Sequence, residues 1–302
     1  MKIRLLSLLL LLSLLLCSCG SEGLLPPTET AETQESTSLP TQTKEEEKKT
    51  EETKTQPVTE EIPLALRLTE EEKADRNAKL VQALQGKKAS FIGDSISTYQ
   101  GYSNNVEYNS TIGENAVYYN GTRKGFSDVN ETWWLQTVHA TGMELLVNNS
   151  WSGDRVTKRG IERAKQLHNN KGENPDVIVV YLGINDFING VTESEFRTAY
   201  DTMIGGMKET YPQADVYLCT LVYTANVSNP SVRPPNVVKF NAIISDLAAK
   251  YEASVVDLYN GTGIVWKNMK EHMADGSLHP NYKGMDMITE CVLSALAENY
   301  LQ

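Results

Sequence analysis

The sequence has 302 residues, a formal net charge of −11 at pH 7 and 22% charged residues, enough chain for one large or two modest domains. Most of the acidity lies in residues 20–61, which hold 11 Glu and 4 Lys. The rest is mildly acidic and has no basic stripe, which excludes nucleic acid as an expected partner.

Residues 1–19 have the pattern of a lipoprotein-type signal peptide. Two basic residues precede the apolar run 5–16, which is too short to span a bilayer comfortably. The cysteines that follow resemble a bacterial lipobox, and Cys19, preceded by a small residue, fits lipidation better than Cys17. We expect an extracellular, cell-surface lipoprotein anchored to the bacterial membrane through Cys19. The alternative is a cleaved signal whose cysteines are discarded.

Residues 20–65 are expected to form a disordered tether. The segment is rich in Thr, Glu and Pro, and such a composition buries too little apolar surface to offset the entropy of ordering. Residues 66–302 form the predicted domain, which is long enough to build a core without disulfides. Its cysteines, Cys219 and Cys291, lie in apolar patterns, and we expect two buried free thiols.

Short apolar segments alternate with helical patterns through this domain. The strand-like segments are residues 89–92, 145–148, 177–182, 216–221 and 254–258. The helical patterns are residues 131–141, 155–168, 235–251 and 284–300, with two more helices opened by capping boxes at Thr69 and Thr192. Continuous apolar strands alternating with helices predict a parallel sheet covered on both faces. The predicted fold class is α/β, a three-layer α/β/α sandwich with a five-stranded parallel sheet.

Residues 100–130 are the exception, because they are rich in Gly, Asn and Tyr and have no period. A loop of this length in a compact domain is usually functional. Its aromatic residues either pack a small core under the loop or form a wall that faces substrate. On the second interpretation Tyr102 and Trp134, together with Trp151 from a later loop, are candidate substrate-binding residues.

Polar sequences follow the predicted strands where they end. They are Gly93-Asp94-Ser95, Ser152-Gly153-Asp154, Gly183-Ile184-Asn185-Asp186 and, before the last helix, Asp275-Gly276-Ser277-Leu278-His279. The carboxyl ends of parallel strands meet at one edge of a sheet, where ligands of such folds bind. The Gly-x-Ser-x-Gly elbow of α/β-hydrolases is absent, since Ser97 stands where its second Gly would be. No metal-binding motif or dinucleotide fingerprint occurs, so neither a metal nor a cofactor is expected.

These four blocks, in this order over roughly residues 86–300, resemble the SGNH hydrolases, also called the GDSL esterase/lipase family. The resemblance implies a flavodoxin-like fold in which Ser95 is the nucleophile and His279 the base. The backbone N–H groups of Ser95 and Gly153 and the side-chain amide of Asn185 would form the oxyanion hole.

One position departs from the family pattern. The acid usually stands three residues before the histidine, where this chain has Gly276, and the nearest aspartate, Asp275, is four residues before. A one-residue bulge would let Asp275 complete a triad. Otherwise a backbone carbonyl would accept the His279 proton, and the site would be a dyad.

The sequence thus predicts an exported serine esterase that removes small acyl groups, with acetyl and carbohydrate esters as first choices, through an acyl-enzyme. Its expected partners are an acylated small molecule or carbohydrate and, through Cys19, a membrane. The alternative within the family is a lysophospholipase or thioesterase. The alternative from another class is a surface protein that binds glycan without turnover.

Overall fold

The computed structural model describes residues 62–102, 117–122, 126–225 and 237–302. The chain divides into two units, Met1–Val58 and Thr59–Gln302, and every described residue belongs to the second. The predicted signal peptide, Cys19 and the tether up to residue 61 lie outside the described residues. Their predictions stay untested.

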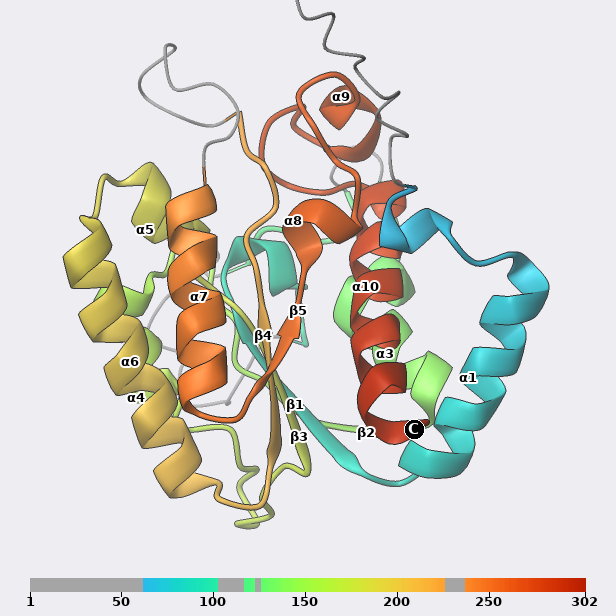
Figure 1. The fold of residues 1–302 in the computed structure, drawn as a ribbon, viewed down its shortest axis with the longest axis horizontal. Helices are drawn as coiled ribbons and strands as arrows, with labels where there is room; N and C mark the ends of the chain where they lie inside the picture. The colour runs from blue at the N-terminus through green and yellow to red at the C-terminus, as the bar shows by residue number, and fades with distance from the viewer. Residues whose placement is uncertain (1–61, 103–116, 123–125, 226–236) are drawn as a thin grey trace, which may run out of the picture. The chain divides into compact units, whose positions relative to one another are not determined.

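The centre of the second unit is a parallel sheet of five strands (Figure 1). The strands are β1 (Lys88–Gly93), β2 (Glu144–Asn148), β3 (Val177–Tyr181), β4 (Asp215–Cys219) and β5 (Ser254–Val256). Their order is β2-β1-β3-β4-β5, so β1 and β3 are neighbours, with Gly93 opposite Tyr181. Every residue of β3 is buried, as expected for a strand covered on both faces.

Helices cover both faces of this sheet (Figure 1). One face carries α1 (Glu70–Leu84), α3 (Trp133–Thr141) and α10 (Tyr282–Tyr300), and the other carries α4 (Ile161–Arg163), α6 (Glu193–Thr210) and α7 (Val238–Lys250). Short helices α5 (Ile184–Ile188), α8 (Leu258–Gly261) and α9 (Met269–His272) follow strands β3 and β5. The predicted three-layer α/β/α fold is confirmed.

Both predicted capping boxes are present, at Thr69 before α1 and at Thr192 before α6. In each, the threonine side chain accepts a backbone N–H that the first turn would leave unpaired. The packed chain begins slightly before the predicted residue 66. Ala65, in the 3-10 helix η1 (Leu64–Leu66), is already buried.

The segment predicted as a helix over residues 155–168 differs in form. It contains a π-helical turn, η5 (Val156–Gly160), followed only by the three residues of α4. Two side chains account for the difference. Asp186 accepts the backbone N–H groups of Val156 and Thr157, and Arg163 turns inward and is fully buried. Tertiary contacts here outweigh the helical pattern.

Cys219 and Cys291 are free and buried, as expected from their apolar surroundings. Burial raises the pKa of the Cys219 thiol well above its usual value and that of Cys291 to about 12, so neither thiol is an activated nucleophile. Among the described helices, none combines the length and the apolar character that crossing a bilayer requires.

Candidate active site

Ser95 lies directly beyond the end of β1, in the 3-10 helix η2 (Ser95–Ser97). Asp94 shapes this turn, because its carboxylate accepts the backbone N–H of Ile96 at 3.0 Å. Gly93 is required by space, since a Cβ there would lie 2.5 Å from Ser97 Oγ. The strand therefore ends in a tight turn that presents Ser95 at the carboxyl edge of the sheet.

His279 and Asp275 reach Ser95 from the loop before α10. His279 Nε2 lies 2.9 Å from Ser95 Oγ, and His279 Nδ1 lies 2.6 Å from Asp275 Oδ2. Ser95 and His279 are 184 positions apart in the chain. The structure thus brings together the predicted nucleophile, base and acid in one hydrogen-bonded series.

Asp275 fills the acid position despite its unusual spacing. Its Oδ1 accepts backbone N–H groups from Ser277, Leu278 and His279 at 2.9, 2.8 and 3.1 Å, while Gly276 has a φ of +74°. This tight turn takes up the extra residue. Burial alone would raise the pKa of Asp275, but the hydrogen bonds from His279 and the backbone outweigh it and hold the pKa well below its usual range. The carboxylate stays ionised beside the base.

The predicted oxyanion donors follow β2 and β3. Gly153 is exposed and has a φ of +72°, with no atom within 4 Å of the place its Cβ would take. Asn185, the second residue of α5, has a buried Nδ2 that finds no hydrogen-bond partner among the described residues. Buried donors are normally paired, so this amide is suited to an acceptor that a ligand brings.

Arg163 is a site residue that the sequence interpretation missed. Its guanidinium is fully buried and binds Asp154 Oδ2 at 2.7 Å, the carbonyl of Gly93 at 3.2 Å and the carbonyl of Asn149. The end of β1 and the loop after β2 are therefore held together by one cation. A lone arginine in a helical pattern resembles a surface residue, so no sequence signal identified it.

Asp186 has a structural role in the same region. Its carboxylate is fully buried and accepts N–H groups from Val156 and Thr157 at 2.8 and 3.0 Å and the Thr157 hydroxyl at 2.7 Å. Burial raises its pKa. Asp186, the residue after Asn185 in α5, thereby connects α5 to η5.

The predicted substrate-binding aromatics divide into two groups. Trp134 is fully buried and Trp151 is 3% exposed, with Trp151 Nε1 donating to Asn149 Oδ1 and its ring under Arg159 and Arg163. Their burial leaves no surface for a substrate, and the prediction is corrected for both: they pack the interior. Only Tyr102, 45% exposed, keeps an accessible ring.

The two interpretations of the aperiodic segment can now be compared. Tyr119 and Phe126 are buried, as in a small core, whereas the half-buried Tyr118 lies flat against the His279 ring. Residues 103–116, including Tyr108, and residues 123–125 lie outside the described residues. The contact between Tyr118 and His279 was not expected, since 161 positions separate the two residues in the sequence.

Other histidines lie outside this arrangement. His139 is exposed, His168 Nδ1 contacts the Tyr211 hydroxyl, and the buried His272 has Nδ1 beside the carbonyl of Asn268. Within the described ranges, no three His, Cys, Asp or Glu side chains group as a metal site would require.

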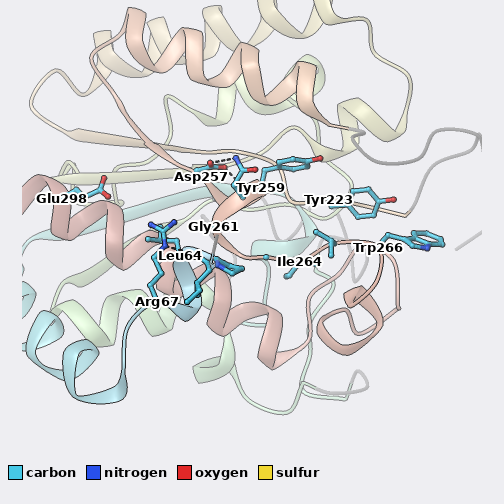
Figure 2. Close-up of a pocket in the computed structure, with 14 residues that line it drawn as sticks. Leu64, Arg67, Tyr223, Asp257, Tyr259, Gly261, Ile264, Trp266 and Glu298 are labelled. Carbon is cyan, nitrogen blue, oxygen red and sulfur yellow. Dashed lines mark hydrogen bonds between the residues drawn. The ribbon is translucent and has the colours of Figure 1, made fainter. Parts of the chain in front are cut away.

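A cavity of about 520 Å³ lies away from the triad (Figure 2). Leu64 and Arg67 line it near the start of the described chain, and Tyr259 and the 57% exposed Trp266 line it from the segment after β5. None of Ser95, Asp275 and His279 is among its described lining residues. The chemistry of the triad is thus not located in this cavity.

Comparison with known proteins places these features in a family. The model of the GDSL-like Lipase/Acylhydrolase family matches residues 91–287, well over half of the chain. Fold and sequence define an α/β acylhydrolase class. The chain belongs to the GDSL-like lipase/acylhydrolase family, as the sequence analysis predicted.

Several solved structures share the fold. A protein described as a GDSL-like lipase from Bacteroides uniformis is 24% identical, with a TM-score of 0.50 over 70% of this chain and 96% of that one. One from Parabacteroides merdae is 17% identical, with a TM-score of 0.53 over 72% and 98%. A carbohydrate esterase of family 3 from Talaromyces cellulolyticus is 14% identical, with a TM-score of 0.50 over 71% and 98%. No curated protein matches the sequence significantly.

Proposed function

We propose that this protein is a serine esterase that removes small acyl groups, acetyl first among them, from carbohydrate. The observation that carries the proposal is the series Ser95 Oγ, His279 Nε2, His279 Nδ1 and Asp275 Oδ2, with distances of 2.9 and 2.6 Å. A hydroxyl is a weak nucleophile until an adjacent base removes its proton. Here the base is in contact and is itself oriented by an ionised carboxylate.

In the first half-reaction Ser95 Oγ bonds to the ester carbonyl carbon, and its proton passes to His279 Nε2. The carbonyl π electrons move onto oxygen, where donors at Ser95, Gly153 and Asn185 stabilise the negative charge. The carbon–oxygen bond to the leaving alcohol then breaks, and that alcohol takes the proton from Nε2. Ser95 is left acylated.

In the second half-reaction water attacks the acyl-enzyme and gives a proton to His279 Nε2. The tetrahedral intermediate collapses, the carboxylic acid leaves, and Ser95 Oγ recovers its proton. Throughout, the Asp275 carboxylate accepts the hydrogen bond from His279 Nδ1–H. It stabilises the imidazolium and is not protonated itself.

Family membership supports ester hydrolysis, and the choice of a carbohydrate ester has separate support. The chain shares its fold with a carbohydrate esterase, and an exposed aromatic residue, Tyr102, lies near the start of the aperiodic segment. Export and a lipid anchor at Cys19, which the sequence of residues 1–19 favours, would place the enzyme at a cell surface where polysaccharide is available.

The test is a panel of acyl esters and acetylated polysaccharides, run on wild type, Ser95→Ala and His279→Ala. Matched controls are Ser194→Ala and His139→Ala, both at exposed positions. We expect turnover of acetyl esters by wild type and both controls, and loss of about 10⁴-fold or more in the two triad variants.

The alternatives give different results in the same panel. A preference that rises with acyl length would favour a lysophospholipase or thioesterase. Glycan binding without turnover, and without labelling of Ser95 by a fluorophosphonate, would favour a binding protein. Equal turnover by wild type and Ser95→Ala would refute the catalytic assignment.

A further inference from the structure

Tyr118 contacts both the nucleophile turn and the base of the triad. Its ring lies flat against the His279 imidazole, with centroids 3.4 Å apart and planes inclined by 7°. Its backbone N–H donates to Thr98 Oγ1 at 2.8 Å, and the Thr98 hydroxyl donates to the carbonyl oxygen of Ser95 at 2.9 Å. One residue therefore meets His279 through its side chain and Ser95 through a buried threonine.

Tyr119 holds Tyr118 in this position. It is fully buried, and its hydroxyl donates to the carbonyl of Pro280, the residue after His279, at 2.7 Å. Its ring meets the Tyr118 ring edge to face, with centroids 4.8 Å apart and an angle of 80°. The backbone N–H of Gln100 donates to the Tyr119 carbonyl at 2.9 Å. The pair thus connects the chain beyond Ser95 to the turn that carries His279.

The imidazole needs such support because its two hydrogen bonds restrain it mainly within its own plane. Asp275 and Ser95 lie at opposite nitrogens, and neither covers a face of the ring. His279 also lies in a surface turn, although its side chain is only 12% exposed. A ring stacked at 3.4 Å opposes tilting of the imidazole out of the line from Asp275 to Ser95.

We propose that Tyr118 is a positioning residue for His279, holding the imidazole in line and stabilising the imidazolium that forms when Ser95 loses its proton. The negative face of an aromatic ring attracts a cation above it, so the contact strengthens as the transition state is approached. This inference rests on the proposed role of His279 as base, and it assigns a function to an aromatic residue of the aperiodic segment.

The experiment compares Tyr118→Phe with two aliphatic variants, Tyr118→Leu and Tyr118→Met. Tyr282→Leu is the matched control, an exposed tyrosine three positions after His279. Four quantities are measured: kcat, KM, the rate of Ser95 labelling by a fluorophosphonate, and the NMR shifts of the His279 ring protons. Thermal unfolding of each variant shows which are folded.

We expect the aliphatic variants to lose about 10- to 100-fold in kcat and in labelling rate, with KM little changed. The ring current of Tyr118 displaces the His279 ring protons upfield, and this displacement should vanish in the aliphatic variants. Tyr118→Phe and Tyr282→Leu should behave as wild type in labelling, kcat and ring shifts. The Phe variant separates the role of the ring face from that of the hydroxyl.

Labelling and NMR also separate this inference from the proposed function. If wild type labels at Ser95 but hydrolyses no ester, the proposed function fails while the labelling rates still decide the role of Tyr118. Equal labelling rates and equal His279 ring shifts in wild type and in a folded aliphatic variant would overturn the positioning role. Loss of labelling in Tyr118→Phe as large as in Tyr118→Leu would overturn it as well.

Discussion

Four aspartates lie at the carboxyl edge of the sheet in two contrasting environments. Asp275 stands in a surface turn, with a side chain 29% exposed and a lowered pKa. Asp94, Asp154 and Asp186 are at most 1% exposed, and burial raises the pKa of Asp94 to about 7 and also raises that of Asp186. Asp275 must stay charged to support His279, the proposed base. The other three hold backbone and arginine groups that place the loops.

Environment and not residue type separates these roles. Asp275 accepts three backbone N–H groups and the His279 ring, all of which favour its charged form. Asp94 has a single backbone N–H partner, from Ile96, against full desolvation. For Asp275 the donors outweigh burial and lower the pKa, whereas for Asp94 and Asp186 burial outweighs the donors and raises it.

The largest expected effect comes from neutralising Asp275, the most exposed of the four aspartates. Asp275→Asn keeps the shape of the side chain but removes the charge that fixes the tautomer of His279 and stabilises the imidazolium. We expect kcat to fall by about 10³- to 10⁴-fold, and the unfolding midpoint to fall as well, because the ionised carboxylate also contributes stability at neutral pH. Steady-state kinetics on an acetyl ester and thermal unfolding measure both. Near-normal kcat would mean that the site functions as a dyad.

The buried ion pair of Arg163 and Asp154 should respond mainly through a loss of stability. Arg163→Met leaves Asp154 buried with only Arg159 Nε, at 3.3 Å, as an ionic partner, and removes a donor from the carbonyl of Gly93. Removing one partner of a buried ion pair costs about 3–5 kcal/mol, which urea unfolding would detect. The double variant Arg163→Met, Asp154→Leu should recover part of that loss. No recovery would show that the carbonyl contacts dominate.

These contrasts also explain how much the sequence could predict. The five strands and the helix starts at Thr69 and Thr192 follow from local patterns. The triad residues follow from the resemblance of the motifs at the strand ends to a known family. Arg163 and Tyr118 could not be predicted, because their roles depend on partners distant in the sequence, such as the carbonyl of Gly93 and the ring of His279.

Two further differences between the sequence prediction and the structure also depend on packing that the sequence does not reveal. Trp151 was predicted to bind substrate as an aromatic residue of a loop after β2, but it is buried with the guanidinium groups of Arg159 and Arg163 over its ring. Asp275 was in doubt because chain spacing does not reveal the φ of +74° at Gly276. A pattern of residue types indicates which elements form, whereas orientation at the sheet edge is set by packing.

A pH-dependent effect follows from the titration of Asp94. Its raised pKa means that the folded state keeps this proton to about pH 7, whereas the unfolded chain releases it near pH 4. Between these values the unfolded state binds fewer protons, so this group's contribution to stability falls as pH rises, by about 1.4 kcal/mol per pH unit at most. Asp94→Asn should lack this loss.

Urea unfolding from pH 4.5 to 8 measures the difference between wild type and Asp94→Asn. The free energy of unfolding of Asp94→Asn, relative to that of wild type, should increase as pH rises and become constant above pH 7. Asp275 has the opposite sign, because its lowered pKa contributes stability that is lost as pH falls below about 4. A difference between wild type and Asp94→Asn that does not vary with pH would mean that Asp94 is ionised throughout.

The smallest expected change in stability is at Gly153, whose N–H is a proposed oxyanion donor and whose neighbour in the chain is the buried Asp154. Gly153→Ala would meet no atom within 4 Å, so its cost is the positive φ alone, about 1–2 kcal/mol. Gly172→Ala is the matched control, with a φ of +77° and equally open space before β3. We expect similar destabilisation in both variants but a lower kcat only in Gly153→Ala, because strain there displaces an oxyanion donor. Equal kcat in the two variants would remove the Gly153 N–H from the oxyanion hole.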